Sequence, residues 1–281
     1  MNTATNHSEP SPLSEAISRC LAEGSAAVLA TLMQVPGNKS AGLRIGAKLL
    51  VKDSGERVDS LGKGELDDAV ARRVNAFLSS RDEARSLSAE ELAPDVEALR
   101  GTSVLFERIE PEPRLVICGA GHVGASLARI AALAGYRVTL IDDRPEFVHR
   151  ELFSAPREQS IELIIATDWS ESVLEAIGNG RGVSVAIVTR GHKQDEDCLR
   201  AVISAAPDYV GMIGSKRRTN IVLDKLRQEG ADENELKKVR APIGLDIGAV
   251  SPEEVAVAIL AEIVAERRGG FGAPLSAWRR A

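Results

Sequence analysis

The sequence predicts an α/β protein in which a smaller N-terminal α+β domain precedes a C-terminal Rossmann-like domain, a doubly wound parallel sheet. Three observations predict this fold. A continuous apolar run at residues 114–118 is typical of a strand that is buried on both faces. A glycine-rich segment, GAGHVG at residues 119–124, follows it directly. Beyond that point strand-like and helix-like segments alternate, which indicates parallel strands joined by right-handed crossovers.

The Rossmann-like domain is expected to span residues 113–270. A helix after the glycine segment is expected to stop at Gly135, and helices are expected to fill the gaps between strands. In such a sheet the first and fourth strands are neighbours, and ligands bind in the crevice at their carboxyl ends. The further predicted strands are 137–141, 161–166, 183–188 and 209–213, and a last helix is predicted at 252–267.

The N-terminal domain is expected to span residues 13–110 and to pair its strands antiparallel. A Glu-Pro-Glu-Pro linker at 110–113 separates it from the second domain, because each proline forces an extended residue before it. Residues 1–12 are expected to be a disordered lead-in and 271–281 a tail. The predicted elements are helices at 12–23 and over Leu66 to Phe77, and strands at 27–35, 47–52, 57–61, 84–87 and 102–109.

Composition excludes several classes of protein. The 281 residues carry a formal net charge of −6, which argues against a nucleic-acid binder, since that function needs a basic face. No apolar run is long enough to cross a membrane, and the polar N-terminus lacks the pattern of a signal peptide. The three cysteines show neither metal-binding nor disulfide spacing. We therefore expect a reduced, cytoplasmic protein without a metal site built by its own side chains.

The glycine segment predicts a site for the phosphate of a nucleotide-like ligand. Gly119 allows the tight turn, Gly121 lets the backbone approach a pyrophosphate, and Gly124 lets helix and strand pack closely. The helix that starts there offers free N–H groups and a positive dipole end to an anion. Asp142, at the end of the second strand, lies at the offset expected for a carboxylate that binds a ribose hydroxyl.

Three neighbouring side chains have alternative roles in this sequence. Asp143 repeats the charge of Asp142, whereas Arg144 is suited to a phosphate or to stacking on a base; both are equally compatible with a solvated loop. His122 is unusual, because this turn normally carries small or apolar residues. We predict that it faces the ligand, the alternative being a surface histidine at a helix start.

A second glycine–histidine segment follows the fourth predicted strand. Arg190, Gly191 and His192 are expected to line the same crevice as the first turn, with Arg190 adding positive charge for a phosphate. Asp195 is expected either to orient an imidazole or to cap the N-terminus of the next helix.

Two later loops complete the candidate site. Gly214 and Ser215 form a strand-to-helix turn in which Ser215 is the expected N-cap, and the three basic residues that follow suggest a bound anion or a solvated first turn. Asp246 lies in an apolar loop with two glycines and is expected to be buried. It either bonds to loop amides or faces the crevice.

Taken together, these segments resemble one family. CGAGHVG, YRVTLIDDRPEF, TRGHKQDEDCLRAV, DYVGMIGSKRR and PIGLDIGAVSPEEVAVAILAEI occur in the order found in the xanthine dehydrogenase accessory proteins, the XdhC/CoxI family. The N-terminal part is similar to the family's first domain, with its R-x-G-A motif at Arg44 to Ala47 and its glycine-rich segment at Gly62 and Gly64. Many members have a cysteine where this chain has Glu65, and the family glutamate two residues later is Asp67 here.

The resemblance implies a function that composition and spacing do not show. It implies a chaperone that binds the molybdenum cofactor, supports its sulfuration and delivers it to xanthine dehydrogenase or a related molybdenum hydroxylase. A cysteine desulfurase is a further implied partner, and we expect a homodimer. The cofactor, a pterin with a phosphate or diphosphate, suits a glycine turn at a helix N-terminus. The absence of the cysteine puts ligation of molybdenum by a thiolate in doubt. The residues alone leave two alternatives open, an NAD(P)-dependent oxidoreductase and a nucleotide-sensing regulatory module.

Overall fold

The computed structural model of the chain describes residues 11–37, 42–80 and 82–276. The chain forms two compact units, Met1–Pro111 and Glu112–Ala281. Nearly all of the expected lead-in and the end of the expected tail lie outside the described residues. Within the described residues no helix is long and apolar enough to span a membrane.

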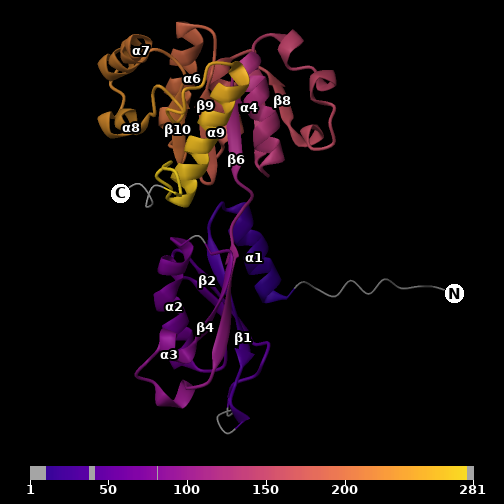
Figure 1. The fold of residues 1–281 in the computed structure, drawn as a ribbon, viewed down its shortest axis with the longest axis vertical. Coiled ribbons are helices and arrows are strands. Elements are labelled where there is room, and N and C mark those ends of the chain that lie inside the picture. The colour runs from indigo at the N-terminus through magenta and orange to yellow at the C-terminus, as the bar shows by residue number, and fades with distance from the viewer. Residues whose placement is uncertain (1–10, 38–41, 81, 277–281) are drawn as a thin grey trace, which may run out of the picture. The chain divides into compact units, whose positions relative to one another are not determined.

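The N-terminal unit is a five-stranded antiparallel sheet in the order β3-β2-β1-β5-β4, with helices on both faces (Figure 1). Alternation along β1 divides its core, because Val28 and Ala30 pack towards α2 whereas Ala27 packs towards α1. This confirms the predicted antiparallel α+β arrangement. The elements are α1 (Pro12–Ala22), β1 (Ala27–Gln34), β2 (Lys48–Lys52), β3 (Arg57–Asp59), α2 (Gly64–Leu78), β4 (Ala84–Ser88), α3 (Ala89–Leu92) and β5 (Ser103–Ile109).

The C-terminal unit is a parallel sheet in the order β10-β9-β6-β7-β8, which confirms the Rossmann-like fold and the pairing of the first strand with the fourth. All five side chains of β9 are buried, as expected for a central strand covered on both faces. The strands are β6 (Arg114–Cys118), β7 (Arg137–Asp142), β8 (Glu162–Ile165), β9 (Val183–Ile187) and β10 (Tyr209–Met212). The helices are α4 (His122–Leu133), α5 (Trp169–Ile177), α6 (His192–Ala205), α7 (Lys216–Gln228), α8 (Glu233–Lys238) and α9 (Pro252–Arg268).

Two apolar clusters cover the two faces of this sheet. On one face Leu115 and Ile117 pack among side chains of α4 and α9. On the other face Val116 and Cys118 pack among side chains of α5, α6 and α7. The alternation along β6 therefore places α4 and α9 side by side on one layer (Figure 1).

One prediction for this unit is wrong. No α-helix connects β7 to β8; that segment contains three short 3₁₀ turns at 145–147, 150–153 and 158–160. The segment itself covers this side of α4, where Val148, Phe153 and Ile161 are buried, whereas α9 lies on the other side of α4, towards β10. Its buried side chains cover this edge of the sheet without an α-helix.

Candidate functional site

The glycine turn after β6 is held by contacts that only glycine permits at two positions. Gly119 has a φ of +113°, and a Cβ there would lie 2.6 Å from the carbonyl oxygen of Val188, directly after β9. A Cβ on Gly124 would lie 1.8 Å from the carbonyl oxygen of Gly119. These two glycines are therefore required by the packing of strand, turn and helix.

The packing of the protein does not require a glycine at position 121. Its backbone is extended, with φ −64° and ψ −174°, and a Cβ there would meet no atom within 4 Å. It is the N-cap residue of α4, where no side chain bonds to the first N–H groups. These groups have no partner within the helix, so the turn presents free donors beside open space.

Asp142, in the neighbouring strand β7, holds this turn in place through hydrogen bonds. Its carboxylate is 2% exposed and accepts a hydrogen bond from the amide of Ala120 at 2.7 Å. Arg144 binds both carboxylate oxygens through Nε and Nη2, at 2.8 and 3.0 Å, and its amide adds a further bond. Burial alone would raise the pKa of Asp142, but the hydrogen bonds from Arg144 and Ala120 outweigh it and lower that pKa.

These contacts change the interpretation of Asp142 and Arg144. The Arg144 guanidinium lies 3.8 Å from the ring centre of Phe147 as well as on Asp142, so the solvated loop that was one alternative for Arg144 is wrong. Both residues hold the turn in place in this structure, and the binding of a ribose hydroxyl by Asp142 stays a prediction. Asp143 is partly exposed and forms an ion pair with Arg190 at 3.4 Å.

The second turn, after β9, is held in place by a buried carboxylate of α6, the helix that follows it. Asp195 is fully buried, accepts a 2.5 Å hydrogen bond from the Thr189 hydroxyl and pairs with Nε of Arg218 at 2.7 Å. The N-cap of α6 is Gly191, without a side-chain cap, so the prediction that Asp195 caps the helix is wrong. Because helix α6 starts at His192, Asp195 lies inside its first turn and points to Thr189 and Arg218.

Both predicted histidines occupy equivalent places. His122 is the first residue of α4 and His192 the first residue of α6, each directly after an uncapped glycine, and both side chains are exposed. The two helices follow the neighbouring strands β6 and β9. The structure therefore places both histidines at the carboxyl edge of the central strand pair.

The loop after β10 begins as the sequence predicts. Ser215 is the N-cap of α7, and its hydroxyl accepts a hydrogen bond from the amide of Arg218. Gly214 has a φ of +150°, a conformation that other residues rarely adopt. Lys216 and Arg217 are exposed, whereas Arg218 turns back to Asp195. Three contacts thus connect the segments at the carboxyl ends of β6, β7, β9 and β10, namely Ala120–Asp142, Asp143–Arg190 and Asp195–Arg218.

The loop containing Asp246 differs from its prediction. Asp246 is exposed rather than buried, as are Ile247 and Gly248, because this apolar segment lies on the surface. The contacts of the loop run to α9: the amide of Gly244 donates to Glu262 at 2.7 Å, and the amide of Leu245 donates to the carbonyl of Ala258. Its convergence with the other four loops stays a prediction.

Comparison with known families decides the relationship of the chain. The family model described as "XdhC Rossmann domain" matches residues 115–263, and that described as "XdhC and CoxI family" matches residues 20–87. The chain belongs to the XdhC and CoxI family.

Three curated proteins are similar to it. Uncharacterized protein YqeB of Escherichia coli is 29% identical over 248 residues, 86% of this chain and 44% of that protein. A probable xanthine dehydrogenase subunit of Bacillus subtilis is 30% identical over 59% of this chain and 47% of that protein. The molybdenum cofactor insertion chaperone PaoD of Escherichia coli is 27% identical over 60% of this chain and 44% of that protein. Each match spans less than half the length of the relative.

In this member of the family the glycine-rich segment lies around the start of α2. Asp67 accepts hydrogen bonds from the Ser60 hydroxyl at 2.6 Å and from the amide of Leu61 at 2.9 Å, so it closes the loop before the helix. Glu65, in the place of the family cysteine, is exposed in the first turn of α2. A Cβ on Gly62 would lie 2.0 Å from the carbonyl oxygen of Gly42, which explains the glycine in that segment.

The three cysteines are buried, each with 0% exposure. Burial raises the pKa of the Cys20 thiol and raises that of Cys198 well above its usual range. Neither is thus a thiolate at neutral pH. Among residues 11–37, 42–80 and 82–276 no group of three His, Cys, Asp or Glu side chains is placed to hold a metal ion.

Sequence reasoning missed Thr189 and Phe147, and it missed the pairing of Arg218 with Asp195. A threonine six residues before a buried acid is a weak signal by itself, since its partner is known only once the turn is folded.

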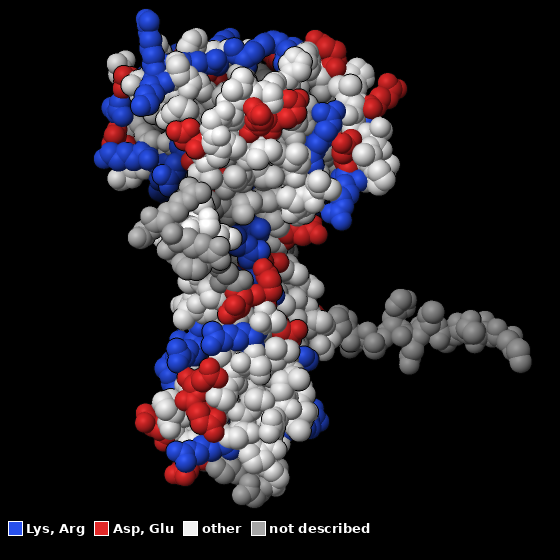
Figure 2. Space-filling view, in the orientation of Figure 1, with Lys and Arg blue, Asp and Glu red and all other residues white. Residues whose placement is uncertain are grey.

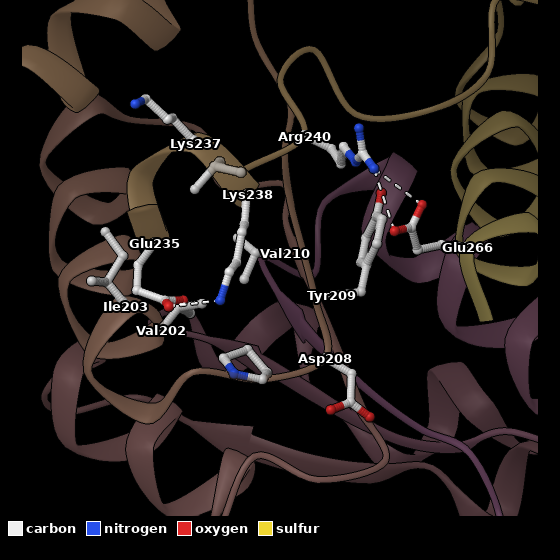
Figure 3. A pocket seen from close by; sticks show the side chains of 12 residues that line it. Val202, Ile203, Asp208, Tyr209, Val210, Glu235, Lys237, Lys238, Arg240 and Glu266 are labelled. Atoms are coloured by element: carbon white, nitrogen blue, oxygen red, sulfur yellow. Dashed lines mark hydrogen bonds and ion pairs between the residues drawn. The ribbon is translucent and has the colours of Figure 1, made fainter. Parts of the chain in front are cut away.

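A cavity of about 310 Å³ was also not foreseen; Tyr209, Lys238 and Arg240 line part of it (Figure 3). It lies where β10 begins, at the amino edge of the sheet, and its Lys238 and Arg240 are paired with Glu235 and Glu266. It is therefore separate from the glycine turns.

Proposed function

We propose that the chain is an accessory chaperone that binds the molybdenum cofactor by its phosphate at the two glycine–histidine turns. In this proposal it supports sulfuration of the cofactor and its insertion into xanthine dehydrogenase or a related molybdenum hydroxylase. Family membership and the similarity to a molybdenum cofactor insertion chaperone support the choice of ligand and role. A cysteine desulfurase is the expected partner for sulfuration.

The observation that carries the proposed site is the open space at Gly121. The packing of the turn explains Gly119 and Gly124 but leaves Gly121 without a role, although any residue adopts its backbone conformation. A glycine that the fold does not require at a helix N-terminus is expected where a pyrophosphate or phosphate approaches the backbone closely.

The charges around the turns suit an anion. The uncapped N-termini of α4 and α6 present two sets of N–H groups and two positive dipole ends at neighbouring strands. His122, His192, Arg190 and Lys193 are exposed and contribute donors there. When bound, the pterin cofactor supplies the phosphate that these groups hold and the molybdenum centre that the recipient enzyme needs.

The proposal assigns no thiolate to the cofactor. Glu65 replaces the family cysteine, and the three cysteines of the chain are buried. Treating the loaded protein with iodoacetamide should therefore leave the bound cofactor in place. Release of the cofactor in step with alkylation of one cysteine would contradict this part of the proposal.

The test of the site is a comparison of glycine variants purified from a host that makes the cofactor. Gly121→Val should lose the bound pterin, measured by mass spectrometry and absorbance, and should keep the melting temperature of the native chain. Gly121→Ala should give an intermediate loading. Gly37→Val is the matched control, since a Cβ at Gly37 also meets no atom within 4 Å, and it should bind normally.

The test of the role is transfer to a partner enzyme. The loaded native chain should activate an apo molybdenum hydroxylase in a reconstitution assay, and the Gly121→Val variant should not. Micromolar binding of NADH with hydride transfer to a small carbonyl compound, together with no pterin binding, would overturn the proposal in favour of an NAD(P)-dependent oxidoreductase. Full pterin loading of Gly121→Val would show that the ligand does not lie on this turn.

A further inference from the structure

Strand β4 is an edge strand of the N-terminal sheet, and part of its backbone has no partner among the described residues. It pairs with β5 on one side only. The amide of Arg108 in β5 donates to the carbonyl of Glu83, so Glu83 and every second residue after it bond to β5. The N–H and C=O groups of Ala84 and Ser86 therefore point away from β5, and both residues are exposed.

The chain closes a comparable edge in its other sheet. Beside β10, the amide of Arg240 donates to the carbonyl of Val210. Met212 bonds to Arg240 through its N–H group and to Ile243 through its C=O group. An edge that is left open is a template for pairing with another extended chain. Strand β4 thus keeps open the kind of edge that the segment after α8 covers at β10.

A groove lies between this open edge and α2. Its cavity of about 230 Å³ has one wall from α2, formed by Arg73, Ala76, Phe77 and Ser80, and another that includes Arg85 and Leu87 of β4. The α2 residues are spaced as one face of a helix. Arg85 lies opposite Phe106 of β5, which belongs to the core under α2. The side chains of Arg85 and Leu87 therefore point to the α2 side of the sheet.

A buried arginine holds this groove in shape. The guanidinium of Arg108 is 5% exposed and donates to the carbonyls of Phe77, Leu78, Ser80 and Asp82, at distances from 2.9 to 3.2 Å. These bonds tie the end of α2, and the chain that leads into β4, to the sheet. The groove is therefore formed without a ligand, which reduces the entropy lost on binding.

The groove contains two arginines whose charge the chain neutralises weakly. Figure 2 shows charged side chains of both signs over α2 and α3. Arg73 donates to the carbonyl of Glu91 at 2.8 Å. Arg85 is 55% exposed and lies 3.7 Å from the carboxylates of Asp82 and Glu91, too far for a hydrogen bond. Its guanidinium has no hydrogen bond to any described residue, so both arginines keep N–H groups for a further carboxylate.

We propose that an extended segment of another protein adds to β4 as an antiparallel strand, with an acidic side chain on Arg85 and Arg73 and an apolar side chain beside Leu87. An extended backbone is the partner that matches the alternating N–H and C=O groups of an open edge. The antiparallel direction is inferred from the sheet itself, in which all strand pairs are antiparallel. The proposal concerns the N-terminal unit and is independent of the ligand bound at the glycine turns.

The register follows from the two outward-facing residues. Segment residues opposite Ala84 and Ser86 would exchange hydrogen bonds with them, and their side chains would point away from α2. Residues opposite Arg85 and Leu87 would point into the groove, where directly opposite side chains lie close together. Because the added strand runs antiparallel, its apolar residue precedes its acidic residue by two positions. Phe77 and Leu87 provide the apolar surface for it.

The first test uses fluorescently labelled peptides and the full chain, with binding measured by anisotropy. The peptide TLTETTT should bind, because its glutamate reaches the two arginines while its leucine lies beside Leu87. The peptide TTTETLT has the same composition but places leucine on the other side of the glutamate, so it should bind about threefold or more weakly. Methylating the backbone nitrogens of the threonines that flank the glutamate should abolish binding, since these N–H groups donate to Ala84 and Ser86.

The second test alters the edge of the sheet. Ser86→Pro removes one outward N–H group, which an edge strand tolerates, and should abolish binding of TLTETTT at a similar melting temperature. Ser86→Ala keeps that group and should bind normally. Arg85→Glu should weaken binding by about tenfold or more. Arg72→Glu is the matched control, since Arg72 is exposed on α2 but does not line the cavity, and it should bind as the native chain does.

Absence of TLTETTT binding up to about 1 mM would overturn the proposal. Undiminished binding of the methylated peptide, or of TLTETTT to Ser86→Pro, would also overturn it, because either result would show that β4 does not pair with the ligand. Tighter binding of TTTETLT would overturn the antiparallel register. A dimer of the native chain that Ser86→Pro dissociates would show that a second copy occupies the edge, and would overturn an occupant from another protein.

Discussion

The two glycine–histidine turns of the Rossmann unit are alike in sequence, but the carboxylates that hold them in place come from different elements. The turn after β6 is held by Asp142, which comes from the neighbouring strand β7 and brings Arg144 with it. The turn after β9 is held by Asp195 of its own helix, with Arg218 arriving from α7. In both, a buried carboxylate is paired with an arginine, but Asp142 accepts from a backbone amide of its turn whereas Asp195 accepts from the Thr189 hydroxyl.

The comparison separates the residues that build the turns from those left to bind a ligand. Sequence patterns predict that Asp142 binds a ribose hydroxyl and that Asp195 orients an imidazole or caps its helix, yet the oxygens of both are occupied by groups of the chain. The exposed residues His122 and His192 at the two helix starts have no such task.

Alanine substitutions at Gly124 and Gly191 should differ most in their effect on the free energy of unfolding. A Cβ on Gly124 would collide with the backbone oxygen of Gly119, so Gly124→Ala should lower the free energy of unfolding by about 3 kcal/mol or more. A Cβ on Gly191 would meet only the flexible end of the Gln194 side chain. Gly191→Ala should therefore change the free energy of unfolding by less than about 1 kcal/mol. Chemical denaturation of both variants measures the difference. Equal losses would mean that both turns are limited by packing.

Removal of either carboxylate should destabilise the Rossmann unit. Asp195→Asn leaves Arg218 without its buried partner and should cost about 3–5 kcal/mol, and Asp142→Asn should cost somewhat less, because Arg144 keeps its stacking on Phe147. Denaturant titrations provide the measurement. A change below about 1 kcal/mol for both would contradict their role in fastening the turns.

The stability of the chain should also depend on pH through Asp142. Its pKa is lowered in the folded state, so the folded state binds fewer protons than the unfolded state near that pKa. The stabilisation is present above the ordinary aspartate pKa of about 4 and is lost as the pH falls through the lower folded value. Melting temperatures between pH 6 and 2 should fall less steeply for Asp142→Asn. Identical slopes for both proteins would exclude this contribution.

The histidines should show the smallest effect on stability. His122→Ala and His192→Ala replace exposed side chains and should shift the free energy of unfolding by at most about 0.5 kcal/mol. If both face the ligand, each should weaken pterin binding while leaving the fold intact, as measured by equilibrium dialysis. Pterin binding that matches the native chain in both variants would remove the histidines from the site.

Local patterns predicted most of the fold. The Arg114–Cys118 run is a central strand, and the predicted helix at 252–267 is α9, with Ser251 as its cap. These features depend on residues close together in sequence, through apolar spacing and capping. The absence of a helix between β7 and β8 was not predictable in this way, because that segment packs on α4 through side chains such as Phe153 that only the folded chain brings together.

The sequence by itself determined the Rossmann-like topology, the position of the glycine turn and the family of the chain, since each depends on the order and spacing of residues. Only the tertiary structure decided that Asp142 and Asp195 hold the turns, that Asp246 is exposed and that Gly121 has free space before it. The reason is physical. The type of a residue fixes which bonds its side chain makes, but its partner depends on the strand or helix that folds against it. For Asp195 that partner is an arginine 23 residues away, on a different helix.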